Sequence, residues 1–164
     1  MSRSRPAASA SAVRWRSSGD GVGSPLGWLW TMITLEAVSR TASRNSSPTR
    51  TSEALLVFAL NTKNLVIGME VVYRGNVSAS LVRVGELFRF AIRVNASAII
   101  IVHNHPSGDA SPSGDDLHLT AEALAAGRLL DVQVLDHIVV AGYEYRSLRE
   151  SGVTFDRPNG GRPA

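Results

Sequence analysis

A short apolar run, residues 97–102 (Ser-Ala-Ile-Ile-Ile-Val), constrains the fold of this chain more than any other segment. Its β-branched residues do not alternate with polar ones, which is typical of a strand that is buried on both faces. A sheet that contains such a strand needs a covering layer on each side. His103 and His105 follow the run directly, so the strand delivers two imidazoles to the edge of that sheet.

The two histidines have the spacing of metal ligands. Side chains alternate along an extended chain, so His103 and His105 point the same way and can share one ion. Two prolines and two glycines within residues 106–114 turn the chain sharply and bring Asp116 back beside the rings. Three ligands leave a fourth position open, as in a catalytic zinc site, and the chain has no cysteine for a closed structural site. We therefore predict one zinc ion held by His103, His105 and Asp116.

The residues around Asp116 also predict the start of a helix. Ser113 precedes two acidic residues and an apolar pattern, which is typical of an N-cap serine with acids in the first turn. The two interpretations are compatible, because a helix that begins at Ser113 places Asp116 on its first turn, facing the histidine loop. His118 lies about 200° around this helix from Asp116 and is expected to face away. Asp109 and Asp115 are interpreted as solvated acids.

These residues resemble a known family. The pattern His-x-His, seven residues, Ser, two residues, Asp is similar to the JAMM signature of JAB/MPN-domain metallopeptidases, and the surrounding Val-His-Asn-His-Pro-Ser-Gly-Asp resembles their RadC-like branch. The resemblance extends over residues 53–152. It includes residues 61–64, 73–75, 95–98, 120, 135–140 and 145–148. It implies a cytidine-deaminase-like architecture and zinc-dependent hydrolysis of a peptide or isopeptide bond.

The resemblance also implies a glutamate general base from an early strand, placed before a hydrophobic run. Glu53 fits, because residues 54–60 are continuously apolar. Glu70 and Glu86 are the alternatives: Glu70 is interpreted as the solvent face of a strand, and Glu86 as a first-turn acid that a helix dipole favours. Ser113, if its hydroxyl is free, would hydrogen-bond the oxyanion that forms during hydrolysis. A hydroxyl used for helix capping would not give that help.

Hydrophobic periodicity predicts an α/β fold. Strands are expected near residues 54–60, 65–73, 97–102, 133–140 and 144–147, and helices near 85–94 and 114–129. Helical patterns interleaved with strands indicate a mixed sheet flanked by helices on both sides. In the fourth strand, Asp136 could orient a ligand ring from behind. Asp136 can equally be a structural residue that forms a hydrogen-bonded polar pair with His137, which is the interpretation we favour.

Charge divides the chain into two parts. Residues 1–50 hold seven arginines against two acids, a net charge of +5, whereas residues 51–164 have a net charge of −2. We predict a basic, largely disordered extension over residues 1–50, a RadC-like JAB/MPN domain over 51–152 and a flexible tail over 153–164. Residues 21–23 and 35–40 faintly resemble the end of the helix-hairpin-helix region that precedes the JAMM domain in full-length RadC-like proteins, or are similar by chance. The arginines would contact DNA weakly and without sequence preference.

Three functions follow from these patterns. The first is a JAMM-type zinc metallopeptidase or isopeptidase, expected in the cytoplasm because no segment approaches the ~18 apolar residues of a membrane span. The second is a metal-binding factor without catalysis, associated with DNA repair or mobile-element DNA. The third is a nuclease, which we rank lowest because the residues of the His-Asn-His nuclease motif are not consecutive.

Overall fold

The computed structural model describes residues 16–17, 53–75, 82–142 and 144–155. Its strands are β1 (Arg16–Ser17), β2 (Glu53–Leu60), β3 (Val66–Gly75), β4 (Ala98–Asn104), β5 (Gln133–Ala141) and β6 (Glu144–Ser147). Its helices are α2 (Val84–Arg93) and α3 (Gly114–Leu130). Apart from β1, the predicted basic extension and its helix-hairpin-helix resemblance lie outside the described residues. The predicted bounds of the strands from β2 onward and of both helices agree with the structure to within two residues.

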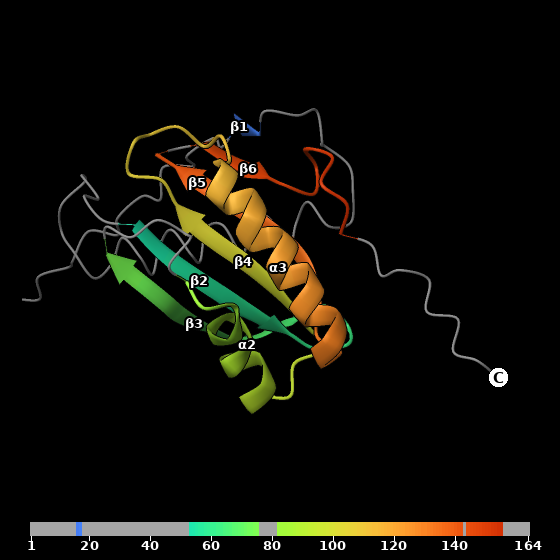
Figure 1. Ribbon diagram of the computed structural model, residues 1–164. Helices are drawn as coiled ribbons and strands as arrows, with labels where there is room; N and C mark the ends of the chain where they lie inside the picture. The colour runs from blue at the N-terminus through green and yellow to red at the C-terminus, as the bar shows by residue number, and fades with distance from the viewer. Residues whose placement is uncertain (1–15, 18–52, 76–81, 143, 156–164) are drawn as a thin grey trace, which may run out of the picture.

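The strands form one mixed sheet in the order β1-β6-β5-β4-β2-β3 (Figure 1). At its centre β4 pairs in parallel with β5 and antiparallel with β2. β3 pairs with β2 and β6 pairs with β5, both antiparallel. β1 pairs with β6 in parallel. All residues of β4 are buried, which confirms the prediction of a strand covered on both faces. The α/β class and the mixed sheet are likewise confirmed.

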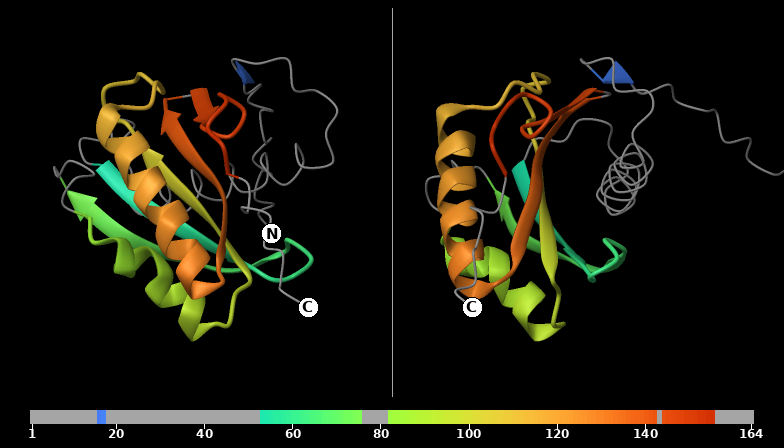
Figure 2. Two further views of the ribbon diagram at one scale, coloured as in Figure 1. Left: turned by 45° about the vertical axis from the view of Figure 1, so that its right-hand side comes forward. Right: turned by 90° about the vertical axis from the view of Figure 1, so that its right-hand side faces the viewer.

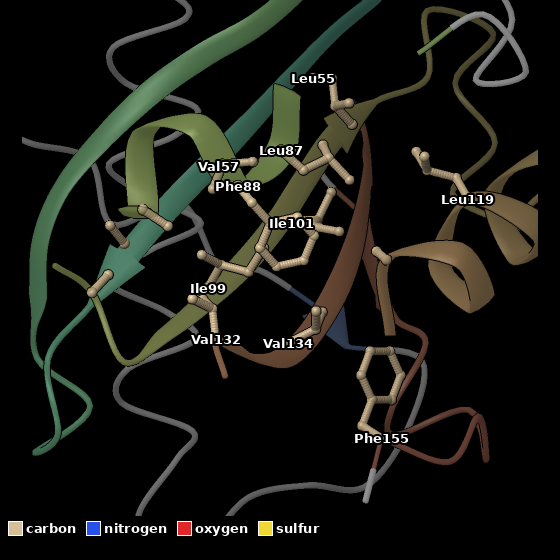
Figure 3. Close-up of a cluster of buried hydrophobic side chains, with 14 of the residues drawn as sticks. Leu55, Val57, Leu87, Phe88, Ile99, Ile101, Leu119, Val132, Val134 and Phe155 are labelled. Carbon is tan, nitrogen blue, oxygen red and sulfur yellow. The ribbon is translucent and has the colours of Figure 1, made fainter. Parts of the chain in front are cut away.

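Both described helices cover the same face of the sheet (Figure 2). Leu87 and Phe88 of α2 and Leu119 of α3 pack in one buried cluster with side chains of β2, β4 and β5 (Figure 3). On the opposite face, a second buried cluster includes Phe58 and Ile100. We expected helices on both sides of the sheet, but within the described residues no helix lies on this second face. None of the described helices is long and apolar enough to span a membrane.

The packed domain continues beyond the predicted boundary at residue 152. Phe155 is only 3% exposed and belongs to the helix-side cluster (Figure 3). Val153 packs against that cluster. The prediction of a flexible tail is therefore wrong for residues 153–155, and residues 156–164 lie outside the part of the chain that the structure describes. These residues stay with the domain because the ring of Phe155 buries a large apolar surface in the cluster.

Glu70 on β3 faces the helical layer. Its carboxylate lies 4.0 Å from a guanidinium nitrogen of Arg89 and 3.7 Å from one of Arg93, both on α2. The prediction that Glu70 lies on the solvent face of a strand is therefore wrong. Nearby, Gly68 leaves room for the ring of Phe90, which would lie 2.7 Å from a Cβ at that position. These contacts hold α2 against β3.

A polar cluster around Asp136 ties β5 to β6 and the following turn. Asp136 is 1% exposed, and its carboxylate accepts hydrogen bonds from the Ser147 hydroxyl, from the backbone N–H of His137 at 2.6 Å and from that of Arg149 at 3.1 Å. Burial raises the pKa of Asp136 to about 6, although all three hydrogen bonds act to lower it. This arrangement agrees with the structural interpretation of Asp136.

Close packing at Gly127 predicts a stability defect on substitution. A Cβ at this position of α3 would lie 2.5 Å from the backbone oxygen of Val132, so backbone must move. We expect Gly127→Ala to lower the free energy of unfolding by about 1 to 3 kcal/mol, although alanine normally favours helices. Gly85→Ala in α2, where a Cβ meets nothing within 4 Å, is the control and is expected to be neutral or stabilising. Urea unfolding measures both, and equal stabilities would contradict the packing argument.

The raised pKa of Asp136 predicts a pH-dependent contribution to stability. In the unfolded chain the carboxyl ionises near its ordinary pKa of 3.8, and in the folded protein near 6. Its stabilisation is therefore fully present below pH 3.8 and is lost as the pH rises through about 6. The difference in unfolding free energy between wild type and Asp136→Asn, both free of metal, is expected to fall by roughly 2 kcal/mol from pH 4 to pH 7. A difference that does not vary with pH would refute the shift.

Candidate metal centre

The three predicted ligands come together where β4 ends and α3 begins. His103 is near the end of β4, His105 follows the strand, and Asp116 lies in the first turn of α3. His103 Nε2 is 3.3 Å from Asp116 Oδ1, and His105 Nε2 is 3.3 Å from Asp116 Oδ2. One ligand atom from each residue lies within 4.8 Å of the others, so the cluster can hold a metal ion. Strand alternation places the two histidines, and the turn into α3 places Asp116.

The ring of His105 is oriented by a backbone carbonyl. Its Nδ1 lies 2.8 Å from the carbonyl oxygen of Asp109. A carbonyl only accepts hydrogen bonds, so Nδ1 carries the hydrogen, and in the neutral ring the lone pair belongs to Nε2. Nε2 is the nitrogen that faces Asp116. The exposed side chain of Asp109 accepts a hydrogen bond from the backbone N–H of Ser111 at 2.8 Å, as expected of a solvated turn acid.

The electrostatics of the cluster favour the protonation states that metal binding requires. Burial lowers the pKa of His103 to about 4, although the carboxylate of Asp116 acts to raise it. For Asp116 burial acts to raise the pKa, but the neighbouring His103 and the hydrogen bonds from Ser113 outweigh it, and the pKa is lowered. At neutral pH His103 is therefore neutral and Asp116 is ionised. A neutral imidazole and a carboxylate are the forms that bind a cation.

Ser113 is the N-cap of α3, and its hydroxyl is engaged there. Its Oγ accepts from the backbone N–H of Asp116 at 3.2 Å, and its hydroxyl donates to Asp116 Oδ2 at 2.7 Å. The backbone N–H of Ser113 donates to the same Oδ2 at 2.6 Å. The predicted N-cap is confirmed as a capping box. The free hydroxyl that the oxyanion role needs is absent at Ser113 in this arrangement, in which Ser113 instead holds the carboxylate of Asp116.

Strand register brings Glu53 to the same cleft. Leu55 of β2 is directly opposite His103 of β4. Because side chains alternate, Glu53 lies on the same face as Leu55, two residues closer to the end where His105 emerges. The half-buried Glu53 lines a cleft of about 290 Å³ together with the three ligands, Ser113 and Tyr73. Neither Glu70 nor Glu86 lines this cleft.

The side chain of Asn104 links the start of β2 to the end of β4. Its side-chain oxygen accepts a hydrogen bond from the backbone N–H of Ala54 at 2.9 Å. This bond holds the residue next to Glu53 against the strand that carries the histidines. The sequence offered no signal for it, because the partner lies 50 positions away.

Behind the ligands lies a buried pair that sequence reasoning missed. His137 Nε2 is 3.0 Å from His103 Nδ1, and Thr120 Oγ1 is 2.7 Å from His137 Nδ1. His137 and Thr120 are both 0% exposed. Burial lowers the pKa of His137 to about 3, so its ring is neutral at physiological pH. Both residues lie at positions that carry the family resemblance, but nothing in the sequence placed them behind His103. Asp136, which the sequence suggested as an alternative for orienting a ligand ring, bonds Ser147, His137 and Arg149 instead.

Two further residues were assigned outside the ligand set. His118 lies on α3 with its side chain 71% exposed and its Nε2 3.5 Å from Glu122, which confirms that it faces away from the cluster. Asp115 is exposed, as expected, but it also lines the cleft. A carboxylate at that place gives the cleft an acidic rim beside the ligands.

Comparison with known proteins agrees with this arrangement. A family model described as the RadC-like JAB domain matches residues 33–153, so the match begins upstream of the domain start that we predicted. A UPF0758 protein of Roseiflexus castenholzii is 49% identical over 65% of this chain and 46% of its own length. Those of Chloroflexus aggregans and Staphylococcus haemolyticus are 47% and 45% identical over 63% and 66% of this chain, and 45% and 47% of their own lengths.

The chain thus spans a little under half of the length of the curated relatives it matches. The family model, by contrast, covers most of this chain, including every ligand of the cluster and Glu53. The chain belongs to the RadC-like JAB-domain family.

Proposed function

We propose that this domain is a zinc-dependent hydrolase of the JAMM type that cleaves the amide bond of a peptide or isopeptide. One observation carries the proposal: Glu53 and the His103–His105–Asp116 cluster line the same cleft, although they come from separate elements. Membership of the JAB-domain family supports it. A carboxylate base beside a three-ligand metal cluster is the arrangement that metal-assisted hydrolysis needs.

The donor set favours zinc as the metal. Two imidazole nitrogens and one carboxylate oxygen are ligands that zinc takes in catalytic sites, and three protein ligands leave a position for water. A zinc ion held by these three residues would supply a water whose pKa is lowered towards ~7. The protein contributes neutral imidazoles and an ionised carboxylate at neutral pH.

Glu53 supplies the proton transfers in this proposal. It accepts a proton from the attacking water and later delivers it to the leaving nitrogen of the amide, so no free hydroxide or free amide anion has to form. Ser113 orients the carboxylate of Asp116, because it donates two hydrogen bonds to Oδ2. The other oxygen, Oδ1, then faces His103. The acidic rim formed by Asp115 would suit a basic residue, such as the lysine of an isopeptide.

Removal of a ligand is expected to abolish stoichiometric zinc binding. The wild-type protein is expected to bind about one zinc per chain, and His103→Ala and Asp116→Ala to bind none tightly, because a pair of ligands cannot replace three. His118→Ala, which alters an exposed histidine on the same helix, is the control and should match wild type. Metal content after dialysis, measured by elemental analysis on folded protein, decides the matter. Stoichiometric zinc in either ligand variant would disprove the site.

Glu53→Gln separates an enzyme from a metal-binding factor without catalysis. The variant keeps the size of the side chain but cannot accept a proton, so zinc content is expected to remain while hydrolysis falls by about 10²-fold or more. Glu86→Gln, at a glutamate outside the cleft, is expected to leave turnover unchanged. Turnover is measured with fluorogenic peptide and lysine-isopeptide panels. No cleavage by the wild type would favour the second function. Equal cleavage by Glu53→Gln would instead move the base to Glu70 or Glu86, or point to another mechanism.

DNA contact through the N-terminal arginines remains a proposal. These arginines precede residue 51, and only Arg16 falls among the residues that the structure describes. The domain from residue 51 onward has a net negative charge, so the proposed substrate is a peptide rather than a nucleic acid.

A further inference from the structure

A chain of buried polar atoms runs from one ligand of the cluster to another through the protein interior. It begins at His103 Nδ1, which is 3.0 Å from His137 Nε2. It continues from His137 Nδ1 to Thr120 Oγ1 at 2.7 Å, and from Thr120 Oγ1 to the carbonyl oxygen of Asp116 at 2.6 Å. The chain thus connects β4, β5 and α3, and both of its ends are residues of the metal cluster.

The last acceptor determines the direction of every hydrogen bond in this chain. The carbonyl of Asp116 can only accept, so the single hydroxyl hydrogen of Thr120 points to it. Thr120 Oγ1 must then accept from His137 Nδ1–H. In a neutral ring this leaves the lone pair on Nε2 of His137, which accepts from His103 Nδ1–H. The lone pair of His103 is consequently on Nε2, the nitrogen that faces Asp116 Oδ1 at 3.3 Å.

The same direction follows independently from the metal end. A metal ion on His103 Nε2 requires that nitrogen to be free of hydrogen, so Nδ1 carries it and must donate. Within the described residues, the acceptor that the structure provides for it is His137 Nε2. Two arguments that start from opposite ends of the chain therefore give the same tautomer for both rings.

We propose that Thr120 and His137 are positioning residues that select the metal-binding tautomer of His103 and fix its ring. The inference rests on metal binding in the proposed function, but not on hydrolysis. Because both residues are completely buried, water cannot replace either partner, and loss of the Thr120 hydroxyl leaves His137 Nδ1–H without an acceptor. His137 is then free to take its other tautomer, which would place a hydrogen on the metal-facing nitrogen of His103.

Thr120→Val tests the proposal with little change in shape, because the two side chains are nearly isosteric. We expect the affinity for zinc, measured by competition with a chromogenic chelator, to fall about 10- to 100-fold in Thr120→Val. Thr120→Ser, which keeps the hydroxyl, is expected to restore the affinity to within about threefold of wild type. His137→Gln and the double variant Thr120→Val/His137→Gln are expected to share one affinity, because both substitutions interrupt the same chain.

Ser147→Ala is the matched control. Ser147 is a buried hydroxyl that bonds Asp136, the neighbour of His137 on β5, just as Thr120 bonds His137. Its loss is expected to lower the stability of the metal-free protein without changing zinc affinity. A role of Thr120 in folding alone would make both variants behave alike.

The tautomers themselves provide a second readout. In zinc-loaded protein labelled with ¹⁵N-histidine, ring nitrogen shifts are expected to show His103 and His137 both with the hydrogen on Nδ1. Wild-type zinc affinity in Thr120→Val, or a hydrogen on Nε2 of His137, overturns the positioning role while leaving the proposed function in place. Failure of the wild type to bind zinc overturns both, and zinc binding without hydrolysis overturns the hydrolase alone.

Discussion

The candidate site depends on the pairing of β4 with a different strand on each side. The antiparallel register with β2 places Leu55 opposite His103 and so brings Glu53 to the cleft. The parallel register with β5 places His137 opposite Ile101, on the face where His103 lies two residues further along. A slip of one residue in either pairing would turn these side chains to the opposite face. The hydrophobic burial of β4 on both faces holds the two registers at once.

Burial gives this site its protonation states. A histidine that is removed from water resists protonation, so His103 and His137 stay neutral well below their ordinary pKa of 6.5. Their remaining ring nitrogens still need partners, and each partner lies on a different element of the fold. Each buried ring nitrogen therefore has one fixed partner in the protein, whereas an exposed ring would exchange hydrogen bonds with many water molecules. The candidate ligands therefore have the protonation states that a cation needs without an ion being present.

Sequence reasoning succeeded where the physical signal is local. Periodicity over a few residues predicted the strands and helices, and the spacing from His103 to Asp116 predicted the metal cluster. Glu53 came from family resemblance, because its place depends on the register of distant strands. Glu70 was assigned to the wrong face, since alternation separates two faces but does not say which one a helix covers. The role of Thr120 depends on the register between β4 and β5 and on the rotation of α3 about its axis. A local sequence pattern predicts neither of them.

Asp116 serves the helix and the metal cluster with the same carboxylate. Oδ2 closes the capping box with Ser113, and Oδ1 faces His103. Asparagine would retain a cap but lose the negative charge, and glutamate would retain the charge but move it by a methylene away from both partners. The start of α3 and the cluster are consequently one cooperative unit: an ion that binds there holds the first helical turn closed. Amide hydrogen exchange in that turn would therefore slow on addition of a metal ion that the cluster binds.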